Sequence, residues 1–163
     1  MEITFDNIYE YLEANKNSLN FISRDDVQAE GFGTSQFCSL FFNKTKNDIP
    51  EEVKVFLIKT FNITERDYDF IQIQKYEIGD YILPHKDPYP CFGLLMLSTS
   101  TQDGLVVQGR DNKYTFITDK VGTFVDVPKF SWHWVNPVRE KTRYTAVYGL
   151  NPLNDKIDEL LDQ

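Results

Sequence analysis

The chain of 163 residues contains two histidines, and each lies in a stretch with a strand-like pattern. His85 precedes Asp87 by two residues, so an extended backbone would place both side chains on one face. His133 lies in the second stretch, with a tryptophan on either side. Two neutral imidazoles and one carboxylate form the facial ligand set of non-haem Fe(II) sites, and they also accept Mn, Co, Ni or Zn. We therefore predict that these residues, the metal triad, meet at one ion.

Neither the His85–Asp87 pair nor His133 is strong evidence for a metal site when taken alone. A single His-x-Asp pair occurs by chance in many sequences, and a histidine between tryptophans on a strand is more often a packed interior residue. The coincidence of both histidines in matching contexts favours the metal site over this bland interpretation.

A candidate anion-binding residue follows the second histidine by ten positions. Arg143 and Thr145 are two residues apart and share one strand face. A buried guanidinium needs an anionic partner and can hold a carboxylate by two parallel hydrogen bonds, to which a threonine hydroxyl could add a third. The alternative is a surface ion pair with an acid such as Glu140, which would contribute little to stability. We favour the inward orientation because the opposite strand face, with Tyr144 among its members, is apolar.

The elements that must position these residues are mostly strands. Two helices are expected before residue 66, from Asp6 or Asn7 to about Ala14 and from residues 47–52 to Asn62. The predicted strands are 20–23, 36–42, 67–76, 91–98, 105–108, 113–118, 123–127, 132–136 and 143–150. The turn residues at 102–104 predict a hairpin between their two flanking strands. Short strands with turn signals every eight to twelve residues indicate a sandwich or jelly roll, with helices packed against it.

Composition limits the classes of partner and compartment. A hydrophobic content of 41% with 15% aromatic residues indicates one folded globular domain. The net charge of -8 makes nucleic acid an unfavourable partner. The N-terminus lacks the features of a signal peptide, and no apolar run could span a membrane. Cys38 and Cys91 are far apart in sequence, so we expect two reduced thiols in a cytoplasmic protein.

Several short motifs, taken together and in order, resemble the Fe(II)- and 2-oxoglutarate-dependent oxygenases, most closely their prolyl-4-hydroxylase-like branch. They cover roughly the C-terminal half to three-fifths of the chain. The motifs are Tyr76-x-x-Gly79, His85-x-Asp87, Asp103-Gly104-Leu105, Val127-Pro128, His133-x-x-x-Pro137-Val138 and Arg143-Tyr144-Thr145.

The resemblance implies a mainly β fold with flanking helices, the double-stranded β-helix, which is a cupin-like jelly roll. This agrees with the jelly roll expected from the strand pattern. We expect a single oxygenase domain over residues 1–163. Helices and short strands would occupy 1–66, the double-stranded β-helix about 67–151, and a short C-terminal helix 152–162.

The resemblance also implies an activity and roles at the site. The metal triad would bind Fe(II), and Arg143 would bind the distal carboxylate of the co-substrate 2-oxoglutarate, with Thr145 and Tyr76 as helpers. The reaction would consume O2, hydroxylate a small-molecule or peptide substrate, and release succinate and CO2. Prolyl peptides are suggested by the family branch alone. One departure is Tyr81, which comes five residues after Tyr76 where the family often has a tyrosine six residues on, so no role is assigned to it.

Two rival functions fit the same jelly roll. A cupin-like metal-binding protein or isomerase would have no oxygenase activity, but such sites usually carry a third histidine, which this chain cannot supply. A binding or structural jelly roll with a vestigial pocket would bind no metal at all. The primary substrate and the oligomeric state stay open.

Overall fold

The structure is a computed structural model that describes residues 1–26, 28–29, 33–87 and 91–150. The described helices and strands are α1 (Ile8–Asn15), β1 (Ile22–Ser23), β2 (Gln28–Ala29), β3 (Gly33–Thr34), β4 (Cys38–Phe42), α2 (Glu51–Phe61), β5 (Phe70–Tyr76), β6 (Ile82–His85), β7 (Cys91–Met96), β8 (Gly104–Gln108), β9 (Tyr114–Thr118), β10 (Phe124–Val125), β11 (His133–Val135) and β12 (Arg143–Gly149). The helix predicted over 152–162 lies outside the described residues.

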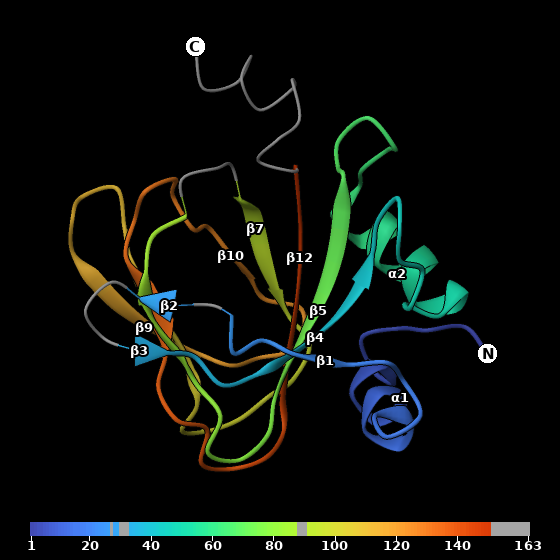
Figure 1. Ribbon diagram of the computed structural model, residues 1–163, viewed down its shortest axis with the longest axis horizontal. Helices are drawn as coiled ribbons and strands as arrows, with labels where there is room; N and C mark the ends of the chain where they lie inside the picture. The colour runs from blue at the N-terminus through green and yellow to red at the C-terminus, as the bar shows by residue number, and fades with distance from the viewer. Residues whose placement is uncertain (27, 30–32, 88–90, 151–163) are drawn as a thin grey trace.

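Two antiparallel sheets face each other (Figure 1). The larger has six strands in the order β1-β4-β5-β12-β7-β10, and the smaller has four in the order β6-β11-β8-β9. A two-stranded ribbon of β2 and β3 is separate from both. Consecutive strands from β5 to β8 alternate between the six-stranded and the four-stranded sheet, which is the winding of a double-stranded β-helix. The predicted fold class is confirmed.

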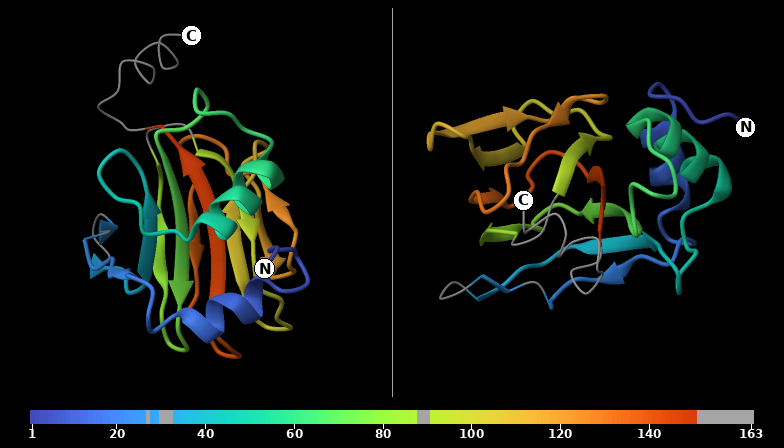
Figure 2. Two further views of the ribbon diagram at one scale, coloured as in Figure 1. Left: turned by 90° about the vertical axis from the view of Figure 1, so that its right-hand side faces the viewer. Right: turned by 90° about the horizontal axis from the view of Figure 1, so that it is seen from above.

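The six-stranded sheet separates two hydrophobic cores. Both helices cover its outer face, as Figure 2 shows, and the core on that side includes Ile8, Leu57 and Tyr144. The second core lies between the two sheets and includes Tyr76 and Val147. Side chains of β12 therefore alternate between the cores, as expected from strand geometry. The expectation that the face bearing Tyr144 is apolar is confirmed.

The N-terminal helices follow the signals in the sequence. Helix α2 begins after Pro50 with two glutamates in its first turn, and their negative charges interact favourably with the positive end of the helix dipole. It ends at Asn62, whose left-handed backbone (φ 56°) lets its N–H reach the carbonyls of Ile58 and Lys59. Among the described residues, no helix is long and apolar enough to cross a membrane.

The hairpin predicted around residues 102–104 is wrong. β7 belongs to the six-stranded sheet, whereas β8 pairs with β9 and β11 in the other sheet. The turn is stabilised by Asp103, whose carboxylate accepts hydrogen bonds of 3.0 Å from the backbone N–H groups of both Arg139 and Glu140. Gly104 lies directly against the carbonyl of Ile117 on β9, so a side chain would not fit there. The Asp-Gly motif thus carries the chain from one sheet to the other.

Candidate metal centre

The pairing of β6 with β11 brings the two histidines together. His85 is the last residue of β6 and lies directly opposite His133, the first residue of β11. On its other side β11 pairs with β8, which places His133 opposite Val107 and fixes it in the middle of the smaller sheet. Asp87 follows two residues after β6 ends. The metal triad is therefore positioned by strand register and not by a mobile side chain reaching across the molecule.

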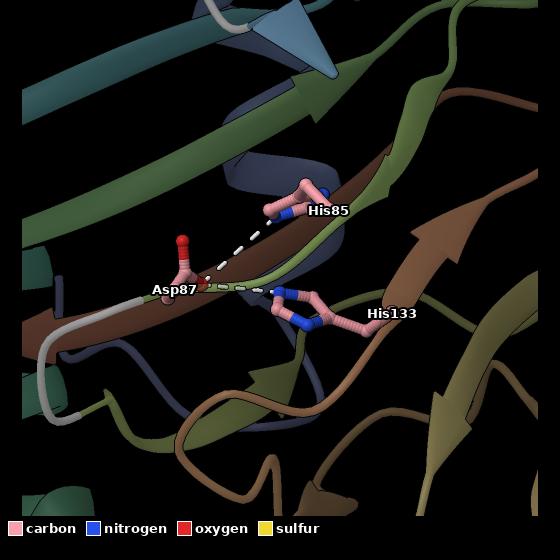
Figure 3. Close-up of side chains that lie close together, drawn as sticks. All are labelled: His85, Asp87 and His133. Atoms are coloured by element: carbon pink, nitrogen blue, oxygen red, sulfur yellow. Dashed lines mark ion pairs between the residues drawn. The ribbon is translucent and has the colours of Figure 1, made fainter. Parts of the chain in front are cut away.

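The ligand atoms of the triad lie close enough to share one ion (Figure 3). One atom from each residue lies within 4.8 Å of the other two. Oδ2 of Asp87 is 3.1 Å from Nε2 of His133 and 3.9 Å from Nε2 of His85. Two atoms bound at right angles to one ion, each at about 2.1 Å, lie about 3 Å apart. The distance to His133 matches this spacing, whereas the distance to His85 would have to shorten slightly when an ion binds.

Backbone carbonyls orient both imidazoles. Nδ1 of His85 lies 2.7 Å from the carbonyl oxygen of Leu83, and Nδ1 of His133 lies 3.1 Å from that of Ser131. A neutral ring that donates from Nδ1 has its lone pair on Nε2, and in both residues Nε2 is the atom that faces the carboxylate. The tautomer that a metal requires is thus set by the backbone.

The electrostatics of the triad suit a cation. Burial, together with the nearby His133, lowers the pKa of His85 below its ordinary value, which keeps this ring neutral. Burial alone would raise the pKa of Asp87, but the contact with His133 and the positive charge that either imidazole carries when protonated lower it. The site therefore offers a neutral imidazole and an ionised carboxylate near pH 7.

The triad lines a cavity of about 120 Å³ between the two sheets. Its described wall is formed by Arg24, Phe37, Phe70, Gln72, Gln74, Tyr76, Ile82, His85, Asp87, Leu94, Leu105, Val127, His133, Val135 and Val147. Most of these side chains are apolar, which makes a dry environment around the three ligands. The side chain of His133 is 10% exposed and that of Asp87 is 24% exposed, so the triad is largely enclosed.

Arg143 points inward, but its partner is neither of the two that the sequence suggested, a ligand carboxylate or Glu140. The residue is 1% exposed, and its Nε lies 2.9 Å from Oδ2 of Asp119, a carboxylate that is equally buried. The predicted alternative, a surface pair with Glu140, is wrong, because Glu140 accepts hydrogen bonds from Thr101. Asp119 engages only Nε. The two terminal nitrogens of Arg143 are buried without a hydrogen-bond partner among the described residues.

Tyr76 and Thr145 lie beside this arginine. The Tyr76 ring stacks on Phe37 with centroids 5.1 Å apart, and its centroid is 5.2 Å from Cζ of Arg143. The hydroxyl of Thr145 donates to Oε1 of Gln74 at 2.9 Å. Among the described residues Tyr76 and Gln74 belong to the cavity wall, whereas Arg143 and Thr145 do not. The guanidinium thus lies directly behind the wall, against the ring of Tyr76.

The tryptophans beside His133 turn away from the metal triad. Trp134 packs against Tyr114 of β9, with ring centroids 5.6 Å apart, and Trp132 lies under the ammonium of Lys86. Packing is the role that strand alternation predicts for them.

Three polar residues near the site escaped the sequence reasoning. Asp119 has the appearance of an ordinary turn residue, because the partner that gives it a role is 24 positions away. Arg24 lies in a short N-terminal strand region that no motif marks. Gln72 shares a face of β5 with Tyr76, which alternation alone predicts, but nothing in the sequence shows that this face lines a cavity.

Comparison with solved structures shows the same fold at low sequence identity. A prolyl-4-hydroxylase from Pseudomonas putida matches with a TM-score of 0.60 and 13% identity, over 91% of this chain and 89% of that one. A 2OG-Fe(II) oxygenase family oxidoreductase from Burkholderia pseudomallei matches with 0.57 and 16%, over 86% and 77%. The viral collagen prolyl hydroxylase of Paramecium Bursaria Chlorella virus-1 gives 0.51 and 16%, over 91% and 92%.

No protein-family model and no curated protein matches the sequence. The likeness therefore rests on the fold, and the chemistry must be argued from the residues of this chain.

Proposed function

We propose that the chain is a non-haem Fe(II)- and 2-oxoglutarate-dependent dioxygenase that hydroxylates an organic substrate and releases succinate and CO2. One observation carries the proposal. The metal triad lies in a largely apolar cavity, and directly behind the cavity wall a buried guanidinium keeps two nitrogens without a partner in the described structure. A buried unpartnered donor is costly, so this fork is best explained as a binding site for an anion.

The residues fit the proposed cofactor and co-substrate. His85, Asp87 and His133 would hold Fe(II) through two Nε2 atoms and one carboxylate oxygen, leaving the remaining positions of the ion for other ligands. The terminal nitrogens of Arg143 would take a carboxylate of 2-oxoglutarate by two parallel hydrogen bonds. When bound, iron with 2-oxoglutarate and O2 supplies the oxidising chemistry, which no protein side chain could provide.

The chain's own groups orient and shield this chemistry. The carbonyls of Leu83 and Ser131 hold the imidazoles in the metal-binding tautomer. Asp119 fixes the plane of the Arg143 guanidinium by accepting from Nε, which leaves the fork free. Tyr76 packs its ring along that guanidinium, and Thr145 holds Gln74 in the wall. Tyr76 and Thr145 would therefore help to bind 2-oxoglutarate.

The two unpartnered nitrogens of Arg143 also weigh against the cupin-like alternative, a metal protein or isomerase without oxygenase activity. Such a protein would need the metal triad but has no use for a buried, unpartnered guanidinium beside it. Strong turnover with Zn(II) and without 2-oxoglutarate would reverse this preference.

The test is a screen for succinate release with Fe(II), 2-oxoglutarate and O2, over peptide and metabolite pools. Mass spectrometry would identify the pool component that gains an oxygen. The solved prolyl hydroxylases of the same fold make prolyl peptides one pool to include, beside free amino acids and small acids. We expect succinate from the wild type and none from His133→Ala. Equal succinate from both proteins would contradict the proposed function.

A further inference from the structure

Arg24 is the one arginine or lysine in the described wall of the metal-site cavity. It lies just beyond β1, and its backbone N–H donates to the carbonyl of Phe37 at 2.7 Å, which ties it to the chain leading into β4. Its side chain is 22% exposed, so the guanidinium is largely enclosed but still accessible. No part of the metal chemistry described above uses this charge.

The guanidinium of Arg24 is anchored at two of its three nitrogens. Nε lies 2.9 Å from a carboxylate oxygen of Asp26, and Nη1 lies 3.3 Å from the hydroxyl oxygen of Ser39. The ring centroids of Phe37 and Phe41 are 5.7 and 5.3 Å from Cζ, so the guanidinium also lies in cation–π range of two aromatic side chains. Nη2 has no hydrogen-bond partner within the part of the chain that the structure describes. Nη2 and the second N–H of Nη1 are therefore available to a ligand.

A second polar side chain is anchored at the same hydroxyl. Nε2 of Gln72 donates to Oγ of Ser39 at 2.6 Å, and Gln72 is also part of the cavity wall. A primary amide carries two N–H donors, and this contact uses one of them. Arg24 and Gln72 thus each keep a further donor while they share the hydroxyl of Ser39.

This group is separate from the arginine assigned to 2-oxoglutarate. Arg143 pairs with Tyr76 across β12 and β5, whereas Ser39 pairs with Gln74 across β4 and β5. Strands β12 and β4 flank β5 on opposite sides. A co-substrate held at Arg143 would therefore leave the guanidinium of Arg24 free for another molecule.

We propose that Arg24 and Gln72, both anchored on the buried hydroxyl of Ser39, form a carboxylate-binding subsite for the organic substrate, so that the substrate is an acid. The inference rests on the proposed function, which supplies the metal and co-substrate beside this subsite. A guanidinium edge matches the two oxygens of a carboxylate better than it matches any neutral group. A local cation is also needed, because the chain as a whole carries a net charge of -8 and repels anions.

The experiment uses the whole chain loaded with 2-oxoglutarate and with Mn(II) in place of iron, so that no turnover occurs. The probes are acetate, N-acetylglycine, benzoate and phenylacetate, each compared with its primary amide. Paramagnetic Mn(II) broadens the proton signals of a probe that binds near the metal, and a parallel sample with Zn(II) gives the diamagnetic baseline. The variants are Arg24→Gln, Arg24→Lys and a control, Arg110→Gln, which removes an exposed arginine paired with Asp126.

In the wild type we expect the acids to be broadened more than their amides. Arg24→Gln should weaken acid binding by about tenfold or more, since a charged hydrogen-bonding partner is lost. Arg24→Lys should retain part of the preference and Arg110→Gln all of it. A separate readout, the thermal shift caused by Mn(II) with 2-oxoglutarate, should be the same in the wild type and in Arg24→Gln.

Three results would overturn the inference. The wild type could broaden acids no more than their amides, or Arg24→Gln could keep the full preference for acids. Third, Arg24→Gln could lose the thermal shift caused by Mn(II) with 2-oxoglutarate, which would assign Arg24 to the co-substrate. A wild type with no shift from Mn(II) and 2-oxoglutarate would contradict the proposed function instead, whatever the probes do.

Discussion

Nε of Arg143 lies 2.9 Å from Oδ2 of Asp119 in an ion pair of which each side chain is only 1% exposed. Burial raises the pKa of Asp119, and the guanidinium beside it opposes that shift. The pair has two consequences. It makes the arginine tolerable in the interior, and it uses Nε so that the two terminal nitrogens stay available. Stability and co-substrate binding should therefore depend on different atoms of one side chain.

Replacing Asp119 by Asn should destabilise the fold by about 3–5 kcal/mol, because it leaves a buried guanidinium without its anion. Chemical denaturation measures this loss. The matched control is Asp126→Asn, which removes an acid from an exposed pair with Arg110 and should change little. If Asp119→Asn unfolds at the same denaturant concentration as the wild type, the buried pair is not what holds Arg143.

Replacing Arg143 by Lys should weaken 2-oxoglutarate binding by about tenfold or more, because a point charge replaces a fork. Lysine can still pair with Asp119, so the fold should survive. Calorimetry with Mn(II) present measures the affinity, and Mn(II) binding without 2-oxoglutarate serves as the internal control. An unchanged affinity for the dicarboxylate would remove Arg143 from the proposed site.

The histidines could be found from sequence because local pattern carries the information. A strand is predicted over 132–136, around His133, and the two-residue spacing of His85 and Asp87 suits an extended chain, but β6 itself is not among the predicted strands. The arginine pair could not be found in this way. Asp119 sits in a turn, and only the tertiary fold brings it to Arg143.

Affinity for Mn(II) should be constant between about pH 7 and 8 and should fall on acidification, because both imidazoles must be neutral to bind. Burial and the nearby His133 lower the pKa of His85 below its ordinary 6.5, so protons on this ring should compete with the metal only below that pH. Electron paramagnetic resonance of free Mn(II) across pH 5 to 8 measures the dependence. An affinity that keeps climbing above pH 7 would contradict this prediction.

Gly104→Ala should cost about 1–3 kcal/mol of stability, because its added carbon would meet the carbonyl of Ile117 and force β8 away from β9. Gly109→Ala is the matched control, since its added carbon would meet the side-chain end of Asp111 at 3.1 Å and the carbonyl of Lys113 at an ordinary 3.8 Å. Thermal unfolding of the two variants compares them. Equal midpoints would contradict the close approach at Gly104.

This glycine also shows why the predicted hairpin failed. Turn residues around Asp103 indicate that the chain reverses, but they do not indicate which strand the next segment joins. Tertiary pairing decides that β8 lies beside β11, and the same pairing sets His133 in place. The two-residue strands β2 and β3 were missed because they are too short to show a period.

The most direct test of the metal centre is a calorimetric titration of the purified chain with Mn(II) in the presence of 2-oxoglutarate. We expect the wild type and the exposed-residue control Asp126→Ala to bind about one ion per chain. Asp87→Ala and His133→Ala should bind none at comparable concentrations while keeping the wild-type far-ultraviolet circular dichroism. Binding of full affinity and stoichiometry by a folded His133→Ala protein would contradict the account.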